Sequence, residues 1–464
     1  MNGTKDIGKV DKRAEARYQN LDSLIGPLKR AAIDAYMRDL KFKLSGKFYE
    51  REGRDPEDGP VTRYVHCPDD KGEGGGKYNT ELLSDHYVHK FSEIRNKIDS
   101  ILEPWFDLPN PGTIRTEMGD VGKVLQVLQA APSEQGGVIA GAGTLYKTIK
   151  DTEEMLNQMA SATVSSFSTN FVGKLDAITQ NLTLGISLWG ASLAAEKGIF
   201  KEARASVVLA VEKATTAFRK VAKKESDNFD FVLKVIKVAI GAYATFVNPT
   251  LSVLQKGVAY AQTGANGLCE IAGEDDERRV TKNVGSYAEG IKSLEDILHL
   301  LNDNIENAEL KVEENIKERL KEMPKNKEAF DIEVQTIEDG ETINQGKEVR
   351  IDPAYVEDIT QRKLPEVAEE IRKAKGKMKY VSMSNCVSRH ENIGIGPSGP
   401  SFHFDRMKWR LTSLLQELAW DVDNGNKDFE LAMAYIRERG EASRKKLEAM
   451  NQKIKEGHYV DPWA

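Results

Sequence analysis

Apolar residues recur every three or four positions over a long central stretch of this chain. The members of this stripe are Val164, Phe167, Phe171, Leu175, Ile178, Leu182, Ile186 and Trp189. The spacing matches the 3.6 residues of a helical turn and not the two-residue alternation of a strand. The stripe therefore predicts a long amphipathic helix, which has to bury its apolar face against other helices.

A second stripe follows after a short break at Trp189 and Gly190. Its members are Phe200, Ala203, Val207, Val211, Ala214, Phe218 and Val221. Glycine tolerates the left-handed conformation in which many helices end, so Gly190 is a natural end for the first helix. We therefore expect an antiparallel helical hairpin, with Trp189 and Gly190 at its turn as a candidate interaction site.

Three further helical stripes lie over residues 294–323, 404–418 and 429–454. Pro324 is expected to end the first of them, because proline removes a backbone donor and breaks a helix. Residues 420–426 either form a turn between the last two stripes or join them into one helix. Long helices of this kind predict an elongated, all-α bundle of antiparallel helices.

Residues 330–400 interrupt the helical pattern. We expect a small irregular or β insertion here, with a hairpin around Asp339 and Gly340 and a helix over residues 354–377. The predicted organisation has four parts: an N-terminal helical region at 1–130, a central bundle at 131–328, the insertion at 329–403 and a C-terminal helical region at 404–464.

The composition excludes several classes of protein. The chain has 464 residues, 66 basic and 73 acidic side chains and a net charge of −7. A nucleic-acid partner is not expected, because such proteins carry a basic footprint. Three cysteines are odd in number and predict no disulfide framework. The N-terminus lacks the apolar segment of a secretory signal, so we expect synthesis as a soluble protein in the cytoplasm, with export left open.

The most apolar run covers residues 231–247 and contains Lys234 and Lys237. It is shorter than the ~20 apolar residues of a membrane-spanning helix. In a helix the two lysines would share one face, which favours a half-buried helix in the bundle over one that crosses a bilayer. The alternative is a concealed membrane-active segment within residues 231–260, as in α-helical pore-forming toxins. Its candidate residues are Phe231, Val235, Ile236, Ile240 and Phe246.

No motif strongly specifies catalysis, a cofactor or a metal. Residues 394–399 read GIGPSG and match the glycine spacing of a dinucleotide site, but Pro400 follows where a helix should begin. Cys386, His390 and His403 lie in the same glycine-rich part of the chain without the spacing of a ligand set. We therefore expect a protein that is not an enzyme.

A helix, a Trp-Gly turn and a second helix of similar length resemble the WxG proteins of type VII secretion in Gram-positive bacteria. Residues 105–114, WFDLPNPGTI, resemble a linker in larger actinobacterial members, and residues 286–309 resemble the long helix that follows their hairpin. The resemblance implies a non-catalytic structural or interaction protein, as a secretion substrate or partner. It would bind protein partners, including copies of itself, through its helix faces. A membrane enters only under the alternative of a pore-forming toxin.

Overall fold

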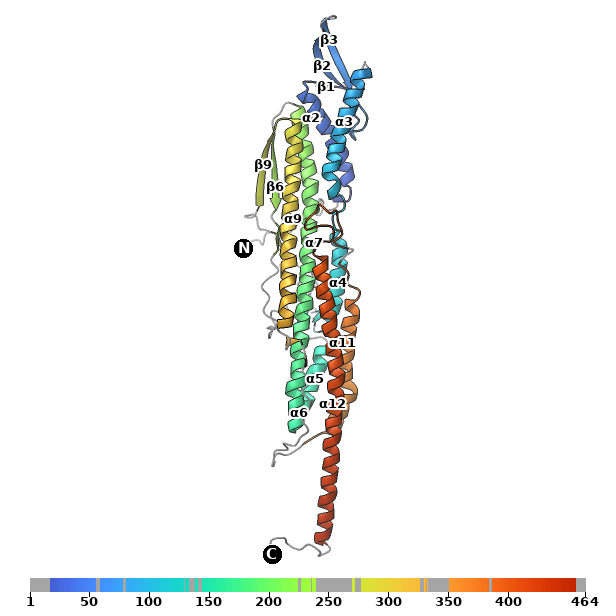
Figure 1. The fold of residues 1–464 in the computed structure, drawn as a ribbon, viewed down its shortest axis with the longest axis vertical. Coiled ribbons are helices and arrows are strands. Elements are labelled where there is room, and N and C mark those ends of the chain that lie inside the picture. Colours follow the sequence, from blue (N-terminus) through green and yellow to red (C-terminus); the bar gives the residue numbers. More distant parts are fainter. Residues whose placement is uncertain are drawn as a thin grey trace, which may run out of the picture.

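The molecule is an elongated bundle of long helices that lie side by side, with a small sheet at one end (Figure 1). The predicted fold class is confirmed. The computed structural model describes residues 17–55, 59–77, 81–128, 130–132, 138–140, 144–223, 227–234, 236–238, 269–271, 277–325, 329–330, 332, 350–383 and 386–455.

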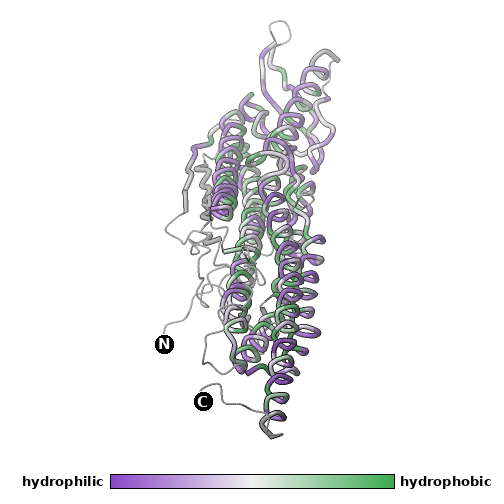
Figure 2. Tube along the Cα trace, turned by 60° about the horizontal axis from the view of Figure 1, so that its bottom comes forward, coloured by the Kyte–Doolittle hydropathy of each residue, from purple (hydrophilic) through white to green (hydrophobic). Residues whose placement is uncertain are grey.

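Ten α-helices account for most of the described chain. They are α2 (Leu21–Asp39), α3 (Glu81–Leu102), α4 (Pro111–Leu128), α5 (Thr144–Asn157), α6 (Ala162–Phe167), α7 (Gly173–Ala222), α9 (Tyr287–Lys325), α10 (Pro353–Asp358), α11 (Leu364–Met378) and α12 (Ser401–Lys455). Short turns of 3-10 or π helix extend several of them: η1 (Glu103–Trp105), η2 (Ser168–Val172) and η5 (Ile359–Lys363). Hydrophobic and hydrophilic stretches alternate along many of the helices (Figure 2), as expected for amphipathic helices.

Helix α7 is the centre of the bundle. It packs against α2, α4, α9 and α12, and every residue from 181 to 196 is buried. Its buried hydroxyl groups donate to carbonyl oxygens one turn earlier, for example Thr183 to Thr179 at 2.7 Å and Ser187 to Thr183 at 2.8 Å. These local hydrogen bonds let polar residues sit inside the core without unpaired donors.

The predicted hairpin turn at Trp189 and Gly190 is wrong. Both residues lie in the middle of α7, which is one continuous helix of 50 residues. A glycine inside a helix costs roughly 1 kcal/mol relative to alanine, and packing on all sides outweighs that cost. Residues 182–195 are apolar or small on every face, which is the pattern of a fully buried helix and not of an exposed turn.

Helix α9 runs antiparallel to α7 and packs along it (Figure 1). Between them the chain forms strand β6 (Asp227–Lys234), which pairs with β9 (Glu277–Val284), and strand β7 (Ile236–Val238), which pairs with β8 (Cys269–Ile271). The helix expected from residue 231 onward is therefore wrong for residues 231–234 and 236–238. The β-branched and aromatic residues of this run suit a strand equally well, and a short apolar run does not distinguish the two.

The described three-stranded sheet lies near the N-terminus. It consists of β1 (Lys43–Ser45), β2 (Phe48–Asp55) and β3 (Gly59–His66) in antiparallel order, within the region at 1–130 that was expected to be helical. The β-hairpin expected around residues 339–340 lies outside the described residues. The helix expected at 354–377 is present as α10, η5 and α11.

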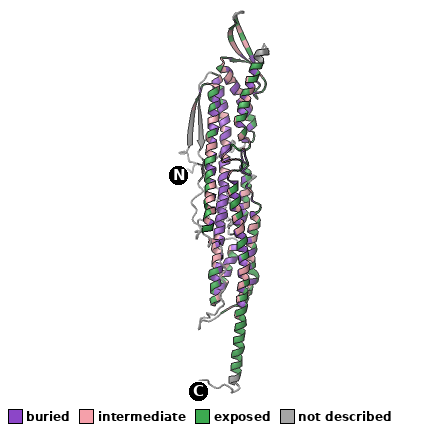
Figure 3. Ribbon diagram, in the orientation of Figure 1, coloured by how far each residue is buried: buried purple, intermediate pink, exposed green. Residues whose placement is uncertain are grey.

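The two C-terminal stripes belong to one helix, α12, of 55 residues. Its first part packs against α11, α7 and α9, and Phe429 stacks on Phe167 with ring centroids 4.2 Å apart. Residues 437–452 are exposed on every face, so this end extends beyond the bundle (Figure 3). Helix α12 continues without a break from its packed part into this exposed part.

Candidate functional site

The structure places the predicted hairpin residues away from any surface. Trp189 is 1% exposed, and its indole Nε1 has no hydrogen-bond partner among the described residues. A partner cannot reach this side chain while α7 is folded. Trp189 is therefore a core residue and not an interaction site in this structure.

The candidate membrane residues are only partly described. Phe231 lies in β6 opposite Val280, and Ile236 lies in β7 opposite Ile271. Val235, Ile240 and Phe246 lie outside the described residues. Lys234 and Lys237 occupy different strands, so they do not share a helix face as the sequence suggested.

The glycine-rich connection between α11 and α12 encloses a buried ion pair. Arg389 Nη2 lies 2.5 Å from Glu309 Oε1 of α9, and both side chains are fully buried. The guanidinium also lies over the ring of Phe200 on α7, 5.0 Å from its centroid. Glu196 of α7 is completely buried beside Glu309. This cluster joins three segments that are far apart in the sequence.

The backbone of the connection completes the cluster. The Gly394 N–H donates to Asn302 Oδ1 at 2.8 Å, and the Ile395 N–H donates to Glu309 Oε2 at 3.0 Å. Arg389 Nε donates to the carbonyl oxygen of Ile393 at 3.1 Å. The connection is thus fixed to α9 by both a buried charge pair and its own main chain.

Two glycines of the GIGPSG segment make this close approach possible. Gly394 has φ +57° and Gly399 has φ +50°, a region that favours glycine. A Cβ at Gly394 would overlap the carboxylate of Glu309, and a Cβ at Gly399 would lie 2.7 Å from Arg389 Nη1. The glycines of this segment therefore allow the connection to cover a buried ion pair. They do not form a dinucleotide-binding loop.

Two carboxylates share a single guanidinium in this cluster. Burial raises the pKa of Glu196 well above its ordinary value, and the nearby Glu309 adds to the shift. Burial also raises the pKa of Glu309 to about 7, although Arg389 opposes that shift. Burial of both acids beside one guanidinium therefore favours retention of one proton by the pair, because two buried negative charges beside one positive charge are unfavourable. The evident role of the cluster is to hold α7, α9 and the connection together.

The surroundings of Cys386 and His403 give little support to a catalytic role for either residue. Burial raises the pKa of the Cys386 thiol to about 12, so the reactive thiolate is scarce at neutral pH. His403 Nε2 lies 2.8 Å from Glu313 Oε1, and burial lowers the pKa of this histidine despite the neighbouring acid. In the described part of the chain, no group of three or more His, Cys, Asp or Glu side chains could hold a metal ion.

The outward face of α12 carries large apolar side chains that nothing in the described structure covers. Phe402, Trp409, Trp420 and Leu431 are each 63–69% exposed. Their separations are 7, 11 and 11 residues, which place them on one line along the helix. We call this set the α12 apolar line. Protein partners commonly use such exposed tryptophans as binding anchors.

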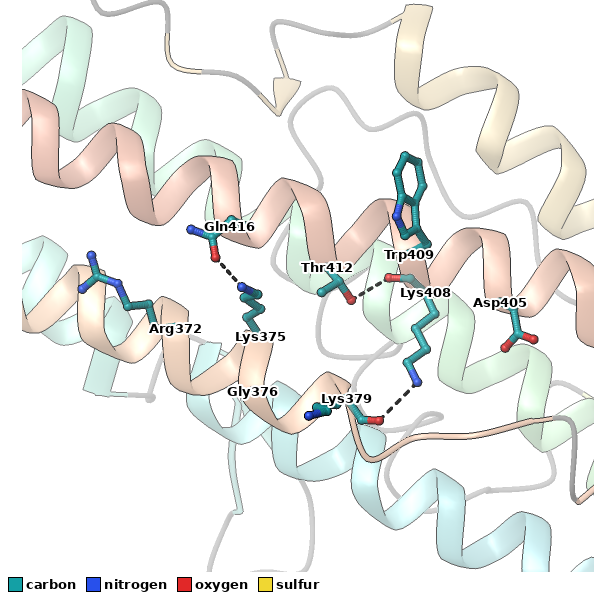
Figure 4. A pocket seen from close by; sticks show the side chains of 9 residues that line it. All are labelled: Arg372, Lys375, Gly376, Lys379, Asp405, Lys408, Trp409, Thr412 and Gln416. Carbon is teal, nitrogen blue, oxygen red and sulfur yellow. Dashed lines mark hydrogen bonds between the residues drawn. The ribbon is translucent and has the colours of Figure 1, made fainter.

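A groove between α11 and α12 adjoins this line at Trp409 (Figure 4). It encloses about 640 Å³. Its lining residues are Arg372, Lys375, Gly376, Lys379, Asp405, Lys408, Trp409, Thr412 and Gln416. The groove is thus predominantly basic, with one carboxylate and an exposed indole.

The helical spacing of these residues indicates the α12 apolar line, although it was not predicted from the sequence. The buried stripe over residues 404–418 defines the inward face of α12. Trp409 and Trp420 fall about 180° from it on a helical wheel, where a bundle helix normally carries polar residues. The basic groove had no such signal, because it depends on how α11 packs against α12.

Comparisons with protein-family models, with curated proteins and with solved structures gave no match. Among the described residues, no helix is both long enough and apolar enough to cross a membrane.

Proposed function

We propose that this protein is a non-catalytic helical protein that binds a protein partner through the outward face of α12. The observation that carries the proposal is the α12 apolar line. Four large apolar side chains, each about two-thirds exposed, lie on one uncovered face of the longest helix. Burying a tryptophan in an interface removes roughly 150–250 Å² of surface from water, so two of them supply effective anchors.

The type VII secretion role implied by the sequence resemblance is a special case of this proposal. It no longer has support from the Trp189–Gly190 hairpin, because α7 is continuous. The remaining support for that role is that the protein consists of long helices with exposed faces. The identity of the bound partner decides whether that special case applies.

Photo-crosslinking tests the proposal directly. A photoreactive amino acid replaces Trp420 in the full chain, which is expressed in its native cells. A matched control carries the same residue at Leu310, an exposed apolar position on α9. We expect a discrete protein adduct from position 420 and none from position 310. Equal labelling at both positions, or none at either, would contradict the proposal.

A second candidate function, a pore-forming toxin or toxin component, is favoured by a different observation. The segment 239–268 has thirty residues with a single charge, Lys256, and in the sequence it connects the paired strands β7 and β8. These strands connect the antiparallel helices α7 and α9. Lys234 and Lys237 lie in different strands, so they do not form the shared helix face that weighed against membrane insertion.

Dye release from liposomes separates the two candidates. If the toxin candidate is correct, the intact protein releases dye and a variant that lacks residues 241–266 does not. The variant Trp409→Ala/Trp420→Ala would still release dye, because the α12 apolar line takes no part in insertion. If the protein acts only through α12, none of the three proteins releases dye.

A further inference from the structure

We propose that the groove between α11 and α12 binds an acidic amphipathic segment of a partner protein. This inference rests on the proposed function and names the chemistry of the partner. Gly376 of α11 lines the groove without a side chain, and a Cβ placed there would meet nothing within 4 Å. The exposed indole of Trp409 forms part of its wall.

The charges of the groove require an acidic partner. Four cations line it, and Asp405 is the one carboxylate among the lining residues. Lys375 donates to the amide oxygen of Gln416, and Lys408 donates to the carbonyl oxygens of Lys379 and Val381 (Figure 4). These acceptors are neutral, so they satisfy hydrogen bonds without cancelling the positive charge.

Arg372 is the exception among the four cations. It pairs with Asp423 and lies 3.9 Å from Glu369. The excess of positive charge in the groove therefore comes from Lys375, Lys379 and Lys408. Asp405 is the single lining carboxylate that opposes it. A partner that places carboxylates near these lysines and an apolar side chain on the indole would match both features.

A second copy of the chain fits the groove less well than an acidic segment does, and so does a polyanion. The exposed end of α12, residues 437–452, carries five basic and three acidic side chains, so it would be repelled by the groove. The whole chain carries a net charge of −7, which opposes binding to nucleic acid or to an anionic membrane. A short acidic segment meets the groove locally without facing that overall repulsion, because salt screens charges beyond about 8 Å.

Peptide selection on the full-length protein tests this proposal. A display library of random 16-residue peptides is selected against the intact chain, and the affinities of recovered peptides are measured by fluorescence anisotropy. We expect recovered peptides to be rich in Asp and Glu around an aromatic residue or leucine. Their Kd should rise at least tenfold with Lys379→Glu and with Trp409→Ala, and binding should weaken in high salt.

Two matched variants provide the controls. Lys321→Glu reverses an exposed charge on α9, and Leu310→Ala removes an exposed apolar side chain from the same helix. Neither should change the Kd of the recovered peptides. The proposal is overturned if no peptide is recovered, if recovered peptides lack acidic residues, or if Lys379→Glu leaves their affinity unchanged. It is also overturned if the groove variants affect binding to phosphatidylserine vesicles or RNA instead.

The result of the peptide selection can be distinguished from the result of the photo-crosslinking experiment. A protein adduct at position 420 together with unaltered peptide binding in the groove variants would reject the groove alone. Groove-dependent peptide binding without an adduct at position 420 would reject the α12 apolar line as the main partner surface.

Discussion

Helices α7 and α12 are similar in length, with 50 and 55 residues, but they occupy opposite environments. All residues of α7 from 181 to 196 are buried, whereas all residues of α12 from 437 to 452 are exposed. The stability of α7 comes from packing on every side. The end of α12 has only its backbone hydrogen bonds and exposed pairs such as Arg444–Glu448, each worth about 0.3–0.5 kcal/mol.

This contrast separates the part of the molecule that holds the fold from the part available for binding. Substitutions in α7 should change stability, and substitutions on the outward face of α12 should change binding. The buried cluster of Glu196, Glu309 and Arg389 belongs to the first group, because it fixes the connection before α12 to α7 and α9.

The largest effect is expected at Trp189. Trp189→Ala should lower the free energy of unfolding by about 3–5 kcal/mol, because it leaves a cavity in a tightly packed core. Trp420→Ala is the matched control on the exposed face, and it should change stability by less than about 0.5 kcal/mol. Urea denaturation measures both. Similar losses for the two variants would remove the contrast between α7 and α12.

The buried acids predict that stability depends on pH. The pKa of Glu309 is raised by burial to about 7, so the folded state holds a proton that the unfolded chain releases near pH 4.5. The contribution of this group is therefore fully present below about pH 4.5 and is lost as the pH rises to about 7. A shift of this size corresponds to about 3 kcal/mol.

Glu196→Gln tests the origin of that pH dependence. The amide keeps a hydrogen-bonding group beside Glu309 but removes one of the two acids that compete for Arg389. Urea midpoints measured from pH 4.5 to 8 should fall less steeply for the variant than for the natural protein. Parallel curves would show that the cluster does not share a proton.

A smaller effect is expected from adding a methyl group at two glycines. Gly394→Ala should destabilise the protein by roughly 1–3 kcal/mol, because Gly394 has positive φ and its Cβ would overlap the Glu309 carboxylate. Gly440→Ala lies in the exposed end of α12, where a Cβ meets nothing within 4 Å. It should strengthen that helix locally by about 0.5–1 kcal/mol and leave the urea midpoint unchanged.

The smallest effect is expected from shortening α12. Removal of all residues after Ile436 should change the free energy of unfolding by less than about 0.5 kcal/mol, since residues 437–452 are exposed on every face. Truncation after Asp428 is the control, because it also removes Phe429 and Met433 from the core. A large loss in the shorter truncation would show that the end of α12 packs against the bundle.

Sequence periodicity predicted the positions of the helices well. It predicted poorly where they end and where they continue. The stripes at 164–221, 294–323 and 404–436 lie in helices, because burial of one face dictates their spacing. From residue 437 to 452 the last stripe is helical but buries no face. Local signals misled at Gly190, where surrounding helices override a weak breaker. They also misled at residues 231–238, where a short apolar run fits either a strand or a helix.

The candidate sites depended on contacts that no spacing reveals. Glu196, Glu309 and Arg389 are far apart in the sequence, and only the packing of α7, α9 and the connection between α11 and α12 brings them together. The GIGPSG segment was correctly interpreted as a loop, but its role as a cap over Glu309 required the fold. The α12 apolar line was readable from a helical wheel once the inward stripe was known.

Under the proposed function, the outward face of α12 binds a partner and the core supports that face. The most direct measurement is the affinity of the partner identified at position 420 for the variant Trp409→Ala/Trp420→Ala. Each anchoring tryptophan is worth about 2 kcal/mol or more, so we predict a loss of affinity of at least roughly a hundredfold, with an unchanged urea midpoint. Leu44→Ala, an exposed apolar position on β1, should leave the affinity unaltered. An affinity that stays within twofold of the natural protein in the double variant would contradict the claim.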